Sequence, residues 1–343
     1  MKLHIFNPEH DMALAANLSN FTAPHAGRLL RSDLGFLPAL WAKDGEAVLV
    51  DCVEVAQRRY NRLRNRIHGQ RPMFVDKYQL ARVDITEVEP WGWDLALRTQ
   101  LLRYGVRCVP AKEFIAETRR LSHRRTAARL LPLLQMEGTV GEALECQTLE
   151  EVCECLKRWQ QVVLKAPWSS SGRGVRFVDH AQNDQKKMLN DMHWVKNVIT
   201  GQGSVMVEPY YKKVRDFGME FLSHGDGRIS YEGLSLFHTA NGAYTGNILA
   251  TEADKIAMIS RYVSVETLQC IKEKICDNLN LGTYAGPFGV DMMATAQGLH
   301  PCVEINLRRT MGHVALALTP MDGSHKVMRI QLEDNYKLKI RKL

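Results

Sequence analysis

Two carboxylates near the end of the chain, Asp291 and Glu304, have the residue types and spacing that most directly indicate chemistry. They are thirteen residues apart, each within an apolar stretch, so two paired strands would bring them side by side. Asn306 shares the strand face of Glu304, and Arg308 follows at the same spacing. Carboxylate and amide oxygens suit Mg²⁺, and a guanidinium binds phosphate or carboxylate groups. Alternatively, the acids pair with arginines for structure alone.

A second segment, Val162–Val175, has the composition of a phosphate-binding strand and loop. Its apolar start predicts a buried strand that ends in Lys165, and the small residues that follow predict a loop. A lysine supplies a point charge to phosphates. Gly172 and Gly174 allow the backbone N–H groups of the loop to close over phosphate oxygens. The segment therefore predicts a triphosphate site.

The elements that must position these residues begin with an N-terminal α/β unit. Short apolar runs predict strands at Leu3–Phe6, Ala47–Val53 and Val106–Pro110, with helices between them that include Asp94–Tyr104. This order favours a parallel sheet over roughly residues 1–115.

The middle and end of the chain predict smaller α+β units. Leu121–Leu134 reads as a basic helix with Ser122 as its N-cap, and Thr148–Trp159 as a helix with a capping box to Glu151. Further strands are expected at Val175–Val178, Ser204–Glu208, Asp216–Ser223, Arg228–Phe237, Phe288–Met293 and Pro301–Ile305.

Together these motifs resemble the ATP-grasp superfamily, which includes D-alanine–D-alanine ligase, biotin carboxylase, carbamoyl phosphate synthetase and glutathione synthetase. The resemblance spans about residues 115–320 and rests on Lys165 with its loop, on Glu208, on Asp291, and on the E-x-N-x-R pattern of Glu304–Arg308. It implies an N-terminal parallel α/β domain followed by an α+β ATP-grasp fold of two subdomains. The expected units are 1–115, 116–204 with the loop, 205–325 with a hinge and the metal site, and a C-terminal helix or basic tail at 326–343.

The resemblance also implies roles in nucleotide binding. Lys165 would contact the α/β-phosphates, and a hinge at Val205–Tyr211 would bind adenine. Asp216 would bind the ribose hydroxyls, although Arg215 or Glu220 could take that role. The loop and hinge residues concerned are Ser169, Ser170, Ser171, Gly172, Arg173, Gly174, Glu208, Pro209 and Tyr210.

One departure from the family pattern concerns an early lysine that usually reaches the phosphates. This sequence has Arg124 or Arg125 in its place, and the pattern does not choose between them or exclude a solvated helix face. A second departure is Gly289, where some ligases have an arginine; Arg308 or Arg309 would then bind the anion.

The activity that the resemblance implies is carboxylate–amine ligation through an acyl phosphate. ATP and Mg²⁺ would be required, with two ions held by Asp291, Glu304 and Asn306, and Mn²⁺ as a substitute. Lys165 and Arg308 would be catalytic, Arg308 by stabilising the acyl phosphate. The alternatives are a small-molecule kinase on the same scaffold and an ATP-binding regulator without turnover. The arginine-rich segment Arg58–Arg71 allows a nucleic-acid binder, but a solvated basic helix explains it better.

Substrate contacts are less defined. Ser235–Ala250, with His238, Tyr244, Thr245 and Asn247 as donors, is either a substrate segment or a surface loop. Arg215 and Arg309 could bind an acidic substrate, and His313 could touch it. Asn7, Glu9, His10 and Asp11 follow the first strand, where α/β sheets tend to place ligands; they could contact substrate, form a structural turn or, less suitably, bind a metal.

Composition sets the remaining expectations. The chain has 343 residues, a formal net charge of +7 and eight scattered cysteines without zinc spacing. It has no apolar leader at Met1–Asp11 and no long uncharged run. We therefore expect a cytoplasmic enzyme of small molecules with reduced thiols, no membrane or nucleic-acid partner, and a homodimer as one possible assembly.

Overall fold

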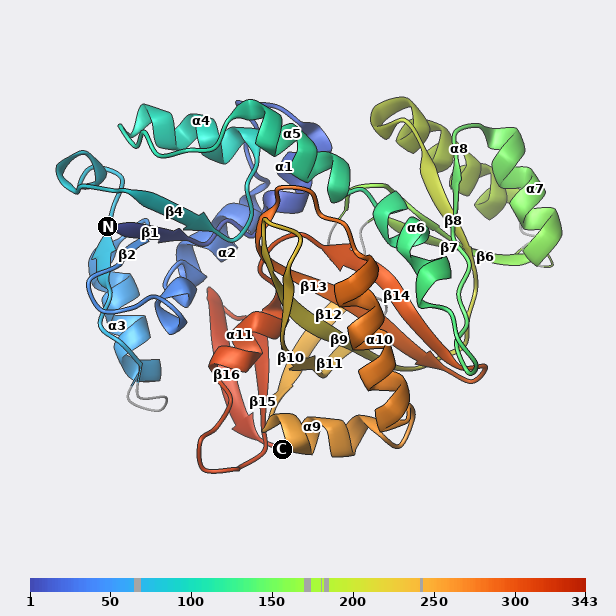
Figure 1. Cartoon of the computed structure of the whole chain (residues 1–343). Coiled ribbons are helices and arrows are strands. Elements are labelled where there is room, and N and C mark those ends of the chain that lie inside the picture. The colour runs from blue at the N-terminus through green and yellow to red at the C-terminus, as the bar shows by residue number, and fades with distance from the viewer. Residues whose placement is uncertain (65–68, 170–173, 180, 182–184, 241–242) are drawn as a thin grey trace.

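The computed structural model describes residues 1–64, 69–169, 174–179, 181, 185–240 and 243–343. Within these ranges the strands form four sheets of four strands each (Figure 1). An N-terminal unit, blue to cyan in Figure 1, and a green unit lie on opposite sides of the orange strands that form the centre of the molecule. No helix in the described ranges is long and apolar enough to cross a membrane.

The N-terminal unit contains a parallel sheet, as the sequence predicted, and the strand order of this sheet is β3-β2-β1-β4. Leu3, Ala47 and Val48 are fully buried, as parallel strands covered on both faces should be. Its elements are β1 (Lys2–Ile5), α1 (His10–Ala16), α2 (His25–Leu34), η1 (Leu37–Leu40), β2 (Ala47–Leu49), α3 (Val53–Arg64), β3 (Met73–Val75), η2 (Leu80–Arg82), β4 (Glu87–Pro90) and α4 (Leu95–Arg103).

The strand predicted at Val106–Pro110 is wrong: these residues form an irregular segment whose Val106 packs in the core. The sheet instead uses β3 and β4, which carry weak sequence signals. β3 has three residues, and β4 alternates Glu87 and Glu89 with apolar residues and ends in a proline. An edge strand tolerates both features.

Two helices connect this unit to the rest, α5 (Lys112–Leu121) and α6 (Arg125–Leu134). Ser122 is the C-cap of α5 and not an N-cap, because α6 begins only after Arg124. Leu130 and Leu134 of α6 share one core with Phe217 and Phe288, so α6 packs on the large sheet although its sequence falls in the expected small unit.

The small sheet is antiparallel, with the order β5-β8-β6-β7. Thr148 and Glu151 form the predicted capping box at the start of α7. Val205–Pro209, expected to open the third unit, is a strand of this sheet, so the change of sheet comes after Pro209. The elements are β5 (Leu144–Cys146), α7 (Leu149–Trp159), β6 (Gln161–Lys165), β7 (Val175–Asp179), α8 (Gln185–Gln202) and β8 (Val205–Pro209).

The large sheet is also antiparallel, with the order β10-β9-β13-β14. It contains the pair predicted to hold the carboxylates, and tight turns join β9 to β10 and β13 to β14. Its elements are β9 (Lys213–His224), β10 (Ile229–Ser235), α9 (Glu252–Ile259), α10 (Val265–Asn278), β13 (Ala285–Thr295) and β14 (Leu299–Asn306).

The fourth sheet, β11-β12-β15-β16, corrects two expectations. Ser235–Ala250 is mostly strand and not a loop, and the C-terminal helix or tail expected at 326–343 is a hairpin. Tyr336, Leu338 and Ile340 alternate with basic residues, which is a strand period, and they pack against the core of the N-terminal unit. The elements are β11 (Phe237–Ala240), β12 (Ala243–Leu249), α11 (Met311–Ala317), β15 (Lys326–Leu332) and β16 (Tyr336–Lys342).

Candidate active site

Asp291 and Glu304 lie directly opposite each other on β13 and β14. The antiparallel register between the two strands therefore holds both carboxylates on one face of the sheet. Asn306 Nδ2 donates a hydrogen bond to Asp291 Oδ2 at 3.1 Å. Burial and the nearby carboxylates of Glu304 and Glu220 raise the pKa of Asp291 to about 8. Burial and mutual repulsion therefore disfavour ionisation of all these carboxyl groups together, and a bound cation would favour their ionised forms.

Arg124, at the N-terminal end of α6, reaches this pair. Its Nη2 donates to Glu304 Oε1 at 2.8 Å, and its Nη1 donates to Ser169 Oγ at 2.8 Å and to the Ala166 carbonyl. Arg125 instead lies 2.9 Å from Glu145. Of the two arginines that the sequence left open, the structure brings Arg124 to the carboxylates.

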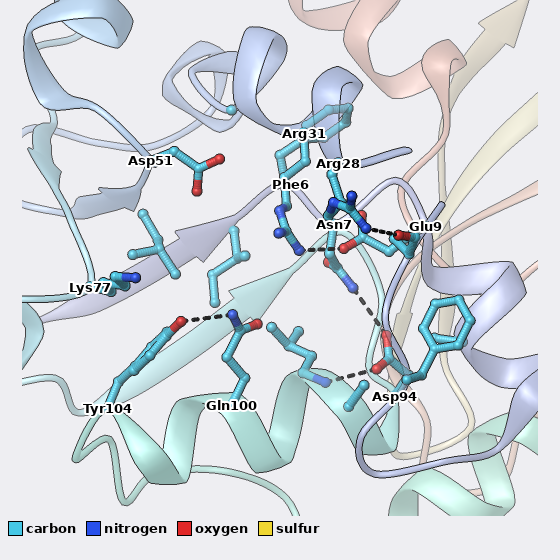
Figure 2. A pocket seen from close by; sticks show the side chains of 18 of the residues that line it. Phe6, Asn7, Glu9, Arg28, Arg31, Asp51, Lys77, Asp94, Gln100 and Tyr104 are labelled. Atoms are coloured by element: carbon cyan, nitrogen blue, oxygen red, sulfur yellow. Dashed lines mark hydrogen bonds and ion pairs between the residues drawn. The ribbon is translucent and has the colours of Figure 1, made fainter. Parts of the chain in front are cut away.

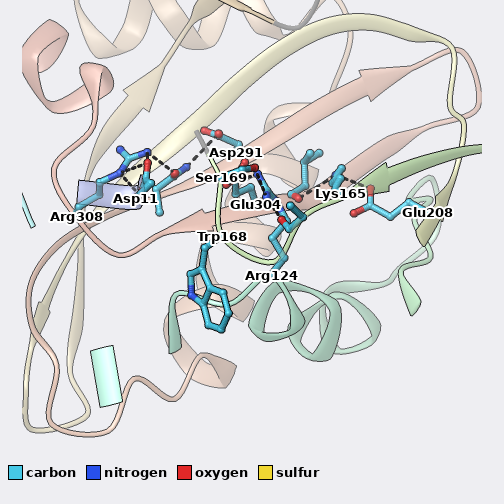
Figure 3. A network of polar contacts seen from close by, with 12 residues as sticks. Asp11, Arg124, Lys165, Trp168, Ser169, Glu208, Asp291, Glu304 and Arg308 are labelled. Carbon is cyan, nitrogen blue, oxygen red and sulfur yellow. Dashed lines mark hydrogen bonds and ion pairs between the residues drawn. The ribbon is translucent and has the colours of Figure 1, made fainter. Parts of the chain in front are cut away.

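Lys165 ends β6 with only 7% of its surface exposed. Its Nζ donates to Glu208 Oε2 at 2.6 Å and to the Val303 carbonyl at 3.4 Å. Val303 precedes Glu304 on β14, so the ammonium group extends from the small sheet to β14 of the large sheet. Figure 3 shows the charged side chains in a row from Arg308 and Asp11, past Asp291 and Glu304, to Lys165 and Glu208.

The loop predicted to bind phosphates is described only at its two ends, Ser169 and Gly174. Ser170, Ser171, Gly172 and Arg173 lie outside the described residues. At the far end, the Gly174 carbonyl accepts from Ala166 N at 2.8 Å. A Cβ at Gly174 would lie 2.3 Å from Cβ and Oγ of Ser169, so only glycine allows this approach.

Arg308 forms a bidentate ion pair with Asp11 of α1. Its Nε lies 2.9 Å from Asp11 Oδ1, its Nη2 lies 2.7 Å from Asp11 Oδ2, and Nη2 also donates to Asn306 Oδ1 at 2.9 Å. Burial opposes ionisation of Asp11, but Arg308 overcomes that effect and lowers its pKa below the usual range. The sequence placed Asp11 among residues of open role; its partner is 297 residues away.

Glu220 is a site residue that the sequence considered only for the ribose. It lies on β9 opposite Gly289 of β13, and Thr310 Oγ1 donates to its Oε2 at 2.8 Å. His313 Nδ1 lies 3.0 Å from the same oxygen, so the buried His313 helps to fix the position of Glu220. The signal in the sequence was an acid within the apolar run Phe217–Leu222.

Asp291, Glu304 and Arg308 line a cavity of about 320 Å³ between the N-terminal unit, the large sheet and the fourth sheet. Arg124 and Lys165 do not line this cavity but contact Glu304 and the Val303 carbonyl of β14 beside it. Its walls combine charged groups with apolar ones from Phe6, Trp91 and Phe237. The polar residues that line it are Asp11, Ser169, Glu220, Ser235, Thr239, Tyr244, Asn247, Asp291, Glu304, Asn306, Arg308 and Thr310.

The comparisons with known proteins identify the fold. No family model and no curated protein sequence matches this chain. Among solved structures, biotin carboxylase from Campylobacter jejuni, in a β,γ-ATP complex, matches with a TM-score of 0.54 at 12% identity and covers 96% of this chain and 75% of that chain. N5-carboxyaminoimidazole synthetase from Staphylococcus aureus, complexed with ADP, matches with a TM-score of 0.51 at 13% identity, covering 85% and 83%. The chain has the ATP-grasp fold.

A further match is the biotin carboxylase domain of 2-oxoglutarate carboxylase from Hydrogenobacter thermophilus, with a TM-score of 0.52 at 14% identity, covering 96% of this chain and 74% of that one. That protein was solved with MgADP, ADP and bicarbonate. These matches confirm the predicted fold class, an N-terminal parallel α/β unit followed by the ATP-grasp α+β units.

The ATP-grasp chain does not bring every predicted residue to the cavity. Arg309 pairs with Glu89 and stacks 4.4 Å from the centre of the Trp41 ring, so it joins the N-terminal unit to the rest. The cavity lining also omits Arg215 and His238, which lie beside each other with Nη1 3.2 Å from Nδ1. None of these three residues lines this cavity, so their contact with a substrate stays a prediction.

The predicted adenine residues lie at the end of β8 in the small sheet, and the predicted ribose residue, Asp216, lies on β9 of the large sheet. Asp216 accepts from Lys213 Nζ at 2.6 Å and from Thr239 Oγ1 at 2.5 Å and does not line the cavity. Pro209 ends β8, and the ring of the exposed Tyr210 meets Phe177 edge-on at 4.8 Å. Glu208 Oε2 accepts a hydrogen bond from Lys165 Nζ, and the role of Glu208 in adenine binding stays a prediction.

The residues present fit a Mg²⁺–nucleotide. Mg²⁺ prefers oxygen ligands and usually takes one or two carboxylates with phosphate oxygens. Asp291, with its raised pKa, and Glu304 form such a carboxylate pair, and Asn306 contributes an amide oxygen close by. Arg124 and Lys165 add positive charge beside Glu304, and phosphate oxygens can accept hydrogen bonds from both groups.

Proposed function

We propose that this chain is an ATP- and Mg²⁺-dependent ligase that joins a small-molecule carboxylate to an amine through an acyl phosphate. One observation supports this most strongly: Asp291 and Glu304 are paired in register, and Arg124 and Lys165 extend from other elements toward the same strand. Oxygen ligands on one side and two buried cations on the other match a phosphoryl-transfer site.

In this proposal Asp291, Glu304 and Asn306 hold Mg²⁺, which neutralises charge on the transferring phosphoryl group. We propose two ions, with Mn²⁺ able to use the same oxygen ligands. Lys165 and Arg124 bind the phosphates, and Ser169–Gly174 covers them. Glu208, Pro209 and Tyr210 lie on the segment proposed to bind adenine.

A carboxylate oxygen of the acyl substrate attacks the γ-phosphorus of ATP, the bond to the β-phosphate oxygen breaks, and ADP leaves. The amine then attacks the acyl carbon, the bond to the phosphate oxygen breaks, and the nitrogen loses a proton. Arg308, fixed by Asp11 and Asn306, is placed to stabilise negative charge on the acyl phosphate. No protein nucleophile is needed, because positioning and charge neutralisation supply the catalysis.

The experiment measures ADP and phosphate released by the full chain with Mg-ATP and pools of carboxylates and amines. We expect release that requires one compound of each class and Mg²⁺ or Mn²⁺. A stable phosphorylated product formed without an amine would make the protein a kinase. Nucleotide binding with no turnover in any mixture would make it a regulator, and either result would overturn the ligase proposal.

A further inference from the structure

The N-terminal unit contains a second and larger cavity, of about 580 Å³, at the carboxyl edge of the parallel sheet. Small-molecule sites usually measure about 300–1,000 Å³. Residues that directly follow β1, β2 and β3 line it, and α4 closes one side. Phe6 is the one residue that lines both cavities, so this one is separate from the carboxylate site.

The position of the cavity follows from the strand order. β1 lies between β2 and β4, so the connections lead to β2 and β3 on one side of β1 and to β4 on the other. The carboxyl end of β1 is therefore a switch point of the sheet. Open α/β sheets tend to bind ligands in the crevice at such a switch point. Asn7 and Asp94 line the cavity there, and Asn7 Nδ2 donates a hydrogen bond to Asp94 Oδ2 at 3.2 Å.

Glu9 provides an independent sign that this cavity can bind a ligand. Its side chain is only 9% exposed and lines the cavity, and Arg31 donates from Nη1 to its Oε1 at 2.5 Å. The second oxygen, Oε2, is buried and has no hydrogen-bond partner among the described residues. Burial raises the pKa of Glu9, and Arg31 offsets only part of that effect. A buried carboxylate oxygen without a donor is costly, so a donor from a ligand would stabilise it.

Positive charge lies beside this oxygen. Arg28 Nη1 donates to the Ala23 carbonyl at 2.7 Å and Arg31 binds Glu9 with one nitrogen, so each guanidinium has further N–H groups for an anion. Figure 2 shows Arg28, Arg31 and Glu9 together at one end of the cavity, with Asp51 and Lys77 farther off. A purely anionic ligand would meet the carboxylates, and a purely cationic one would meet the guanidinium groups.

We propose that this cavity is a second ligand site for a small zwitterion with an ammonium and a carboxylate group, an α-amino acid or a short peptide. The ammonium group would donate to Glu9 Oε2, and the carboxylate would accept from Arg28 and Arg31. Phe21 and Leu97 supply apolar wall for a side chain. The proposal does not depend on the ligase reaction, because it uses none of the residues assigned to that reaction.

The test is isothermal titration calorimetry of the full chain, without nucleotide, against the common L-amino acids. We expect at least one to bind with one site per chain. Its N-acetyl derivative, which lacks the ammonium, and its amide, which lacks the carboxylate, should each bind at least tenfold more weakly. Binding by none of the amino acids, or equal binding by either derivative, would overturn the proposal.

Two variants locate the site. In Glu9→Gln an amide oxygen can still accept from Arg31 but the charge is lost, and we expect at least a tenfold loss of affinity. Ala96→Trp fills the cavity from α4 without changing charge and should abolish binding. Both should keep the ADP affinity of the unaltered chain, which shows that they are folded. If both bind the amino acid normally while Arg308→Lys does not, the ligand occupies the cavity of the proposed ligase site, and this proposal fails while the ligase proposal stands.

Discussion

The two cavities differ in how their buried carboxylates are satisfied. In and beside the carboxylate cavity, Arg308 pairs with Asp11 and Arg124 pairs with Glu304, both across distant parts of the chain, and Lys165 pairs with Glu208 of the neighbouring strand β8. In the N-terminal cavity Glu9 keeps an oxygen without a partner among the described residues. Ion pairs between distant elements fix the positions of the charged side chains, and a nucleotide with its metal would exchange one set of partners for another. Glu9 is paired through Oε1 alone, so its second oxygen can accept a hydrogen bond from a ligand.

The largest effect should come from removing one carboxylate of the first cavity. In Glu304→Gln the amide oxygen can still accept from Arg124, so the fold should persist, but the charge for Mg²⁺ is lost. We expect Mg²⁺-dependent turnover to fall about 10²–10³-fold, the usual cost of losing one electrostatic partner of a transition state. A second readout needs no substrate: Mg²⁺ should no longer raise the affinity for a non-hydrolysable ATP analogue in calorimetry.

The matched control is Glu9→Gln, which makes the same change in the other cavity. It should leave the effect of Mg²⁺ on nucleotide affinity intact. If Mg²⁺ still raises nucleotide affinity in Glu304→Gln, or no longer does so in Glu9→Gln, the proposal that only the carboxylate cavity binds the metal and nucleotide is wrong.

The second prediction asks whether Lys165 binds phosphate or only supports the fold. Lys165→Met should weaken ADP binding about 10–100-fold, because a charge-assisted contact to phosphate is lost. It should also lower the free energy of unfolding by about 3–5 kcal/mol, since Glu208 stays buried without its partner.

Lys255 is the control for that variant, because it is equally buried and pairs with Glu252 at 2.9 Å outside the cavity. Lys255→Met should lower stability in denaturant titrations and leave ADP affinity unchanged. Equal ADP affinity in both variants would make Lys165 a structural residue.

The third prediction uses two neighbouring arginines. Arg124→Ala should reduce nucleotide affinity about tenfold, whereas Arg125→Ala, which loses only the ion pair to Glu145, should change it less than twofold. Calorimetry with ADP and Mg²⁺ measures both. Equal losses would mean that the family's early basic position is not held by Arg124.

These residues also show what the sequence could predict. The Asp291–Glu304 pairing followed from two apolar strands joined by a short turn, and the burial of Lys165 followed from the apolar run before it. Adjacent arginines on a helix point in different directions, and only the packing of α6 on the large sheet selects Arg124. The Asp11–Arg308 pair joins the two ends of the chain, which no local pattern reports.

The missed strands have a similar cause. β3 and β4 are too short and too polar for an apolar run to mark them, and their neighbours in the sheet stabilise them. The C-terminal hairpin was missed because its lysines suggested a solvated tail, although the apolar residues between them have a strand period.

The fourth prediction concerns a buried histidine of the large sheet. His300 on β14 is 1% exposed, and neither ring nitrogen has a hydrogen-bond partner in the described part of the chain. Burial, and secondarily the charge of Lys165, lowers its pKa to about 3. The folded protein therefore keeps His300 neutral at mildly acidic pH, where the unfolded chain takes up a proton near pH 6.5.

The sign follows from proton uptake by the unfolded state. Above about pH 6.5 His300 is neutral in both states, and as pH falls toward 3 the unfolded chain binds the extra proton, so stability is lost. At pH 5 this loss is about 2 kcal/mol for one such histidine. His300→Leu has no imidazole to titrate. Urea titrations at pH 7 and pH 5 measure how much the free energy of unfolding falls between these pH values. We expect this fall to be about 2 kcal/mol smaller in the variant than in the unaltered chain. His123, whose pKa burial also lowers to about 3, is still present in the variant, so part of the dependence of the unfolding free energy on pH should remain. An unchanged slope in His300→Leu would mean that His300 gains a proton in the folded state, and that the wall beside Lys165 is open to water.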